Sequence, residues 1–243
     1  MQNKSHKLTV ISVIILLILT PIIMFLSLNI FQEGNYYIAA VSIIILSIIP
    51  FYVFFEQRKI KTSEIVTLSV MIALCVASRA VMAYIPQVKP TCALVIVTAI
   101  AFGPNVGFFT GSLSMFISNF IFGQGMFTPF QMLGMGLVGF ICGLIFHKKP
   151  YSNNKLAVGI VGGLACFIVY GIIVDSCSFL MMSTDFTFKS ALKIYLSGMS
   201  FNFIHGITTG ILLFFINKPM TDKFNRLRIK YGIFSLECKN EKV

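Results

Sequence analysis

Charged side chains are scarce in this sequence. Only 11% of its 243 residues are Asp, Glu, Lys or Arg, just 8 of these are acidic, and tryptophan is absent. A typical soluble domain is about one quarter charged, so a soluble particle of this composition would lack the polar side chains needed to cover its surface. The composition therefore excludes a soluble enzyme, a small disulfide-stabilised domain and a disordered chain.

Motifs for catalysis and nucleotide hydrolysis are also missing. The sequence has no G-x-x-x-x-G-K-[ST] phosphate loop, no G-x-S-x-G nucleophile elbow and no H-E-x-x-H zinc motif. The six cysteines form no C-x-x-C pair, and most lie in apolar runs, where cysteine usually acts as a small hydrophobic residue. We therefore predict no catalytic residue, no metal site and no cofactor, and any use of ATP would need a partner subunit.

Apolar residues dominate what is present, at 57% of the chain and a mean hydropathy of +0.89. A membrane-spanning helix needs about 20 apolar residues, and eight candidate segments occur: 8–28, 37–55, 65–84, 91–102, 106–122, 127–146, 156–182 and 195–216. The fourth is too short to cross unaided, so we expect it to be tilted or packed inside the bundle. The prediction is an all-α polytopic membrane helix bundle with three parts: two N-terminal helices and a basic linker (1–61), a six-helix core (62–217) and a basic tail (218–243).

The positive charges predict how these helices are oriented. The net charge is +11, and the basic residues lie in short runs between apolar segments, a pattern that encodes membrane topology rather than nucleic-acid binding. With both termini in the cytoplasm, 15 Lys and Arg residues lie in cytoplasmic segments and three lie outside. We therefore predict a multi-pass cell-membrane protein with cytoplasmic N- and C-termini, in contact with lipid and not with nucleic acid.

Polar residues inside the spans indicate a binding site. Ionisable groups are costly in a membrane and usually face a cavity or one another. In the predicted topology such groups, together with several amides, gather near the outer side: Arg79, Asn119, Gln124, Gln131, Asp175, Asn202 and His205. One interpretation is a binding chamber that opens outward. The alternative is a structural ion pair between Arg79 and Asp175, with His205 bonded to a backbone carbonyl.

Two outer loops have an unusual composition. Residues 84–91 contain two prolines and Lys89, and residues 122–132 combine glycines, amides and aromatics, including Phe127. Thr128 is suited to cap the following helix, with Pro129 at its first position. Met, Phe and amide side chains suit a large, flat, partly apolar ligand, although an interfacial aromatic belt would also explain them.

Small residues recur every four positions along the third span, at Ser69, Ala73 and Ala77. Such a stripe allows another helix to approach closely in lipid, either within the bundle or from a second protein. Glycine pairs with the same spacing (107/111, 139/143 and 206/210) are expected to pack helices inside the bundle.

Residues from about 62 to 217 resemble the substrate-binding S components of energy-coupling factor (ECF) transporters, the vitamin importers of many bacteria. The resemblance rests on six helices, an alanine-rich first core helix, the missing ATP motif, and the segments IPQVKPT (85–91), FGQGMFTPFQM (122–132) and GLVG (136–139). These loops are similar to the cobalamin-type branch. The two N-terminal spans are a departure from the six-helix form.

This resemblance implies a function and a set of partners. It implies that the chain is a non-enzymatic binding subunit in a bacterial cell membrane, that Ser69, Ala73 and Ala77 dock on a transmembrane scaffold subunit, and that two ATPases supply the energy. It implies cobalamin as transported ligand rather than as cofactor, bound by the outer polar residues with Lys89 and Phe127. Two alternatives remain: an S component for another vitamin or micronutrient, riboflavin-like or queuosine-like, or a self-sufficient membrane carrier.

Overall fold

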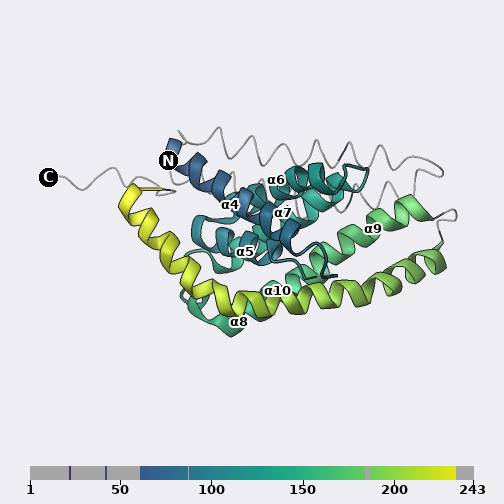
Figure 1. Cartoon of the computed structure of the whole chain (residues 1–243). Helices are drawn as coiled ribbons and strands as arrows, with labels where there is room; N and C mark the ends of the chain where they lie inside the picture. Colours follow the sequence, from purple (N-terminus) through teal and green to yellow (C-terminus); the bar gives the residue numbers. More distant parts are fainter. Residues whose placement is uncertain (1–21, 23–41, 43–60, 87, 184–186, 234–243) are drawn as a thin grey trace.

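The computed structural model describes residues 22, 42, 61–86, 88–183 and 187–233, which form helices joined by short loops (Figure 1). Five helical stretches are long and apolar enough to cross a membrane, and one helix is shorter. This confirms the predicted all-α polytopic bundle for the part of the chain that the structure describes. The spans predicted at 8–28 and 37–55 lie, apart from residues 22 and 42, outside the described residues.

The elements are α4 (Thr62–Val81), α5 (Thr91–Phe102), α6 (Pro104–Phe122), α7 (Thr128–Phe146), the 3-10 turn η2 (Pro150–Asn153), α8 (Lys155–Ala165), the π-helical turn η3 (Cys166–Tyr170), α9 (Gly171–Met182) and α10 (Phe188–Tyr231).

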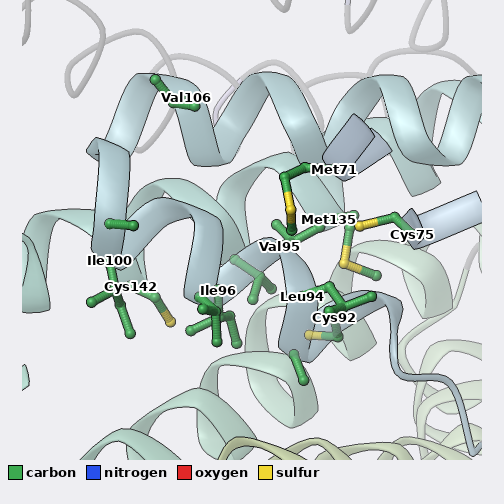
Figure 2. Close-up of a cluster of buried hydrophobic side chains, with 14 of the residues drawn as sticks. Met71, Cys75, Cys92, Leu94, Val95, Ile96, Ile100, Val106, Met135 and Cys142 are labelled. Atoms are coloured by element: carbon green, nitrogen blue, oxygen red, sulfur yellow. The ribbon is translucent and has the colours of Figure 1, made fainter. Parts of the chain in front are cut away.

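The short helix α5 lies in the centre of the bundle. It is about 18 Å long at 1.5 Å per residue, well short of a hydrocarbon core of roughly 30 Å. All 12 of its residues are buried, and it is apolar on every side, as a fully enclosed helix should be. Figure 2 shows Met71 and Cys75 of α4 and Met135 of α7 among the buried side chains around it. The prediction that this span packs inside the bundle is confirmed.

Glycines allow α6 to approach α7 closely. The chain turns from α5 into α6 at Gly103, whose φ of 108° favours glycine, and Pro104 then begins α6. A methyl group added at Gly139 of α7 would lie 2.5 Å from the Gly107 carbonyl oxygen of α6. One added at Gly111 would lie equally close to the carbonyl oxygen of Met135. The backbones are therefore in direct contact, and the predicted packing of these glycines within the bundle is confirmed.

A second glycine contact joins α8 to α10. A methyl group at Gly163 would lie 2.8 Å from the Gly206 carbonyl oxygen, and one at Gly210 would lie 2.9 Å from the Gly159 carbonyl oxygen. Each helix thus presents two glycines four residues apart to the other, the spacing that brings helices together in membranes.

Helix α10 is much longer than the predicted span. The sequence predicts a membrane span over 195–216 and a basic tail from residue 218, but α10 begins at Phe188 and continues through Pro219 to Tyr231. Burial on the bundle explains the continuation, because the Phe224 ring packs on Phe102 with centroids 5.1 Å apart. Figure 1 shows this C-terminal part of α10, in yellow, turning towards the start of α4.

Contacts across one end of the bundle fix this arrangement. Asn217 Nδ2 donates to the Ser152 carbonyl oxygen over 2.9 Å, and Lys61 Nζ donates to the Gly232 carbonyl oxygen over 3.5 Å. We call this end, which holds Lys61, the loop 147–154 and Asn217, the basic end. The opposite end, where α4 and α6 finish and α7 begins, is called the polar end.

Candidate functional site

Arg79, in the last turn of α4, is the centre of a hydrogen-bond network at the polar end. The side chain is buried, and its Nη1 donates to Asn119 Oδ1 over 2.8 Å and to Ser118 Oγ. Its guanidinium carbon lies 4.8 Å from the centre of the Phe122 ring, a cation–π contact. Three residues of α6 therefore satisfy a charge that would otherwise be costly to bury.

The network continues from Asn119 into the next helix and loop. Asn119 Nδ2 donates to Thr128 Oγ1 and to Gln131 Oε1, both over 3.0 Å. Thr128 Oγ1 in turn donates to Gln124 Oε1 over 3.0 Å, and Gln124 Nε2 donates to the Phe116 carbonyl oxygen. Four of the residues predicted from the sequence thus share one network: Arg79, Asn119, Gln124 and Gln131.

The predicted capping role of Thr128 is wrong. The N-cap of α7 is Phe127, which makes no side-chain capping bond, and Thr128 is the first residue of the helix. Its hydroxyl instead serves the network described above, where it accepts from Asn119 and from the Gly125 amide.

A second polar cluster joins α9 to α10. Asn202 Nδ2 donates to Asp175 Oδ2 over 2.7 Å. The close approach requires a glycine, because a methyl group at Gly198 would lie 2.4 Å from Asp175 Oδ1. Arg79 and Asp175 therefore have separate partners, and within the described residues no ion pair joins them, which removes the structural alternative considered from the sequence.

His205 lies on the same face of α10, one turn beyond Asn202. It is 3% exposed, and its Nε2 has no hydrogen-bond partner among the described residues. Its ring meets the edge of Tyr170, with centroids 5.4 Å apart. A buried polar atom without a partner costs roughly 1–3 kcal/mol, so this nitrogen is a candidate to bond a ligand.

Tyr170 lies beside His205 and was not predicted. It is the last residue of the π-helical turn η3, its ring packs against Gly134, and it meets the His205 ring. Isolated π turns are frequent at functional sites. The sequence offers no signal for this turn, since the residues around it, 156–174, form one continuous apolar run.

The two predicted loop residues behave differently. Lys89 is half-buried between α4 and α5, and burial together with the nearby charge of Arg79 lowers the pKa of its ammonium group. Phe127 is partly buried and packs against the core around Phe130 and Leu133. Its role in ligand binding stays a prediction.

A family model described as "ECF-type riboflavin transporter, S component" matches residues 59–222, which is more than half of the chain. The chain belongs to this family of ECF S components. No curated protein and no solved structure matches it. Membership makes this S component a multi-pass membrane subunit of a vitamin transporter and implies partnership with ECF scaffold and ATPase subunits. The family is one of transporter components rather than enzymes, and the match does not support the expected cobalamin-type branch.

The small-residue stripe of this S component faces outward. Ser69, Ala73 and Ala77 are all exposed on α4, whereas Met71 and Cys75 are buried in the bundle core. The stripe is therefore available to a second protein, unlike the glycine pairs, whose backbones already meet other helices of the chain.

Proposed function

We propose that this chain is the substrate-binding subunit of an ECF importer and that it captures a flat heteroaromatic vitamin of the riboflavin type at the polar end. The observation that carries the proposal is His205 Nε2, which is buried without a partner beside Tyr170 and close to the Asp175–Asn202 pair. A ligand that bonds this nitrogen would recover the cost of its burial.

The chemistry of the surrounding groups supports a planar ligand with polar edges. Tyr170 offers an aromatic ring beside His205, and hydrogen-bonding groups are present in the Arg79–Asn119 network and in the Asp175–Asn202 pair. A fused ring system with carbonyl and ring-nitrogen edges matches such a site. The description of the matching family model supports riboflavin ahead of cobalamin.

The partners follow from the same proposal. The exposed stripe of Ser69, Ala73 and Ala77 is the contact for the scaffold subunit, and the ATPase subunits supply the energy. The vitamin is cargo, and no cofactor is proposed. We also retain the orientation predicted from the charges, with the basic end cytoplasmic and the polar end outside.

The test is equilibrium binding to the purified full chain in detergent, with riboflavin, cobalamin, thiamine and biotin in parallel. We expect saturable riboflavin binding at nanomolar to low-micromolar concentration, and a loss of about tenfold or more in the His205→Ala variant, since tenfold corresponds to about 1.4 kcal/mol. His147→Gln, at the basic end, is the matched control and should bind normally. Tight binding of cobalamin instead would overturn the ligand assignment, and binding of none of the four would overturn the site.

A further inference from the structure

An apolar groove runs along the outer surface between α8 and α10. Its volume is about 560 Å³, and its floor is the glycine contact of these two helices. The walls are exposed apolar side chains, with Leu156, Ile160 and Leu164 on α8 facing Ile207 and Ile211 on α10. Four aromatic rings complete the lining: Phe167, Phe203, Phe214 and Phe215.

The length of the groove corresponds to one leaflet of a bilayer. Its lining on α10 extends from Phe203 to Phe215, which is about 18 Å of helix. Half of a hydrocarbon core of roughly 30 Å is about 15 Å. The groove therefore reaches from the basic end to about the middle of the membrane.

Two lysines lie at the basic end of this groove. Lys155 lines the groove at the start of α8, with its Nζ 5.8 Å from the centre of the Phe214 ring. Lys218 follows Phe214 by one helical turn on α10 and is exposed. The bond from Asn217 to Ser152 holds the loop that precedes Lys155 against this part of α10. The acidic residue Asp222 lies a further helical turn beyond Lys218 along α10.

We infer that this groove binds an anionic phospholipid of the leaflet at the basic end, with an acyl chain between α8 and α10 and the phosphate at Lys155 and Lys218. The apolar walls of the groove suit an acyl chain, and basic pockets between membrane helices bind anionic head groups. The acyl chain of a zwitterionic lipid would occupy the groove equally well, but its head group would gain less binding energy from the two lysines. The groove lies on the exposed face of α8 and α10, whereas His205 is buried, and the groove does not depend on which vitamin is transported.

The absence of tryptophan from the sequence allows a direct test. Ile211→Trp places a single fluorophore on the groove wall of the full chain. The control, Val70→Trp, places one on the exposed surface of α4 at a similar distance from the basic end; Val70 is 59% exposed and Ile211 is 53% exposed. Each variant is reconstituted in phosphatidylcholine vesicles containing a minor fraction of either brominated phosphatidylglycerol or brominated phosphatidylcholine, and quenching is measured.

We expect brominated phosphatidylglycerol to quench the Ile211→Trp probe at least about fivefold more effectively than brominated phosphatidylcholine, the preference that one surface lysine provides. The preference should fall close to one when Lys155→Gln and Lys218→Gln are added, and the Val70→Trp probe should show none. Equal quenching by the two lipids at Ile211→Trp would overturn the inference. So would a preference that survives both lysine substitutions, or shielding from both lipids, which would show that protein covers the groove.

Discussion

Asn202 donates a hydrogen bond to Asp175 over 2.7 Å, which joins α10 to α9 one turn from the unpartnered nitrogen of His205. This bond fixes the carboxylate at the proposed site. Asn202→Ala should therefore weaken riboflavin binding about tenfold while the protein still folds. The reason is that the Asp175 carboxylate would no longer be held in position for the ligand. The measurement is a binding titration of the purified chain.

Asn217 provides the matched control for this substitution. It also lies on α10 and donates one hydrogen bond, to the Ser152 carbonyl oxygen, but at the basic end. Asn217→Ala should lower the melting temperature without changing the affinity. Equal effects of the two substitutions on affinity would contradict the location of the site.

The exposed stripe on α4 predicts a separation of binding from transport. Ala73→Leu or Ala77→Leu adds bulk where we expect a scaffold helix to approach closely. Ligand binding by the isolated chain should be unchanged, whereas uptake by cells that express the complete transporter should fall at least tenfold. Ser200→Leu, a similar enlargement on the exposed face of α10, should leave both unchanged. Loss of ligand binding in the α4 variants would show that the stripe supports the fold instead.

The glycine contacts predict graded losses of stability. A methyl group at Gly139 would lie 2.5 Å from a backbone oxygen of α6, whereas one at Gly159 would lie 3.0 Å from a backbone oxygen of α10. Overpacking of this kind typically lowers the free energy of unfolding by about 1–3 kcal/mol. For a chain of this size, each kcal/mol lowers the melting temperature by about 2–4 °C. Gly139→Ala should thus lower the melting temperature clearly more than Gly159→Ala. The reverse order would contradict the helix contacts described.

His147 predicts a pH dependence of stability. It follows α7 at the basic end, its Nδ1 lies 2.9 Å from the Ile100 carbonyl oxygen, and burial, with the charges of Lys148 and Arg228, lowers its pKa in the folded protein. Protonation is therefore harder in the folded state than in the unfolded state, where the pKa is near 6.5. The stabilisation is complete above that value and is lost as the pH falls below it.

This dependence is measured as the change in melting temperature between pH 7.5 and pH 5.5. The wild-type chain should lose a few degrees more than His147→Gln over this interval. The same loss in both proteins would show that other groups are responsible.

The sequence predicted the helices better than their ends and loops. Hydropathy located α5 correctly at 91–102, because Pro90 before the apolar run and Gly103 and Pro104 after it mark both of its ends. It did not predict that α10 continues past Pro219. This continuation depends on the contact between Phe224 and Phe102, two residues that lie far apart in the chain. Local composition contains no information about such a contact.

The site shows the same division. Depth in the membrane was sufficient to group Arg79 with Asn119, Gln124 and Gln131, since polar groups at one depth can meet. Tyr170 was missed because its position depends on the π-helical turn η3. This turn contains one extra residue and lies within an apolar run, so residue type does not reveal it. Phe127 was placed in the right loop, but its packing against α7 could not be inferred from residue type.

The burial of α5 also bears on how the protein enters the membrane. A helix of 12 residues gains too little from contact with lipid to remain in the bilayer alone. Gly103 and Pro104 join α5 tightly to α6, so the two helices would enter the membrane as a hairpin. Helix α6 would then hold α5 in the membrane until α4, α7 and α10 pack around it. Assembly of the bundle, rather than partitioning of the segment, then keeps this helix in the membrane.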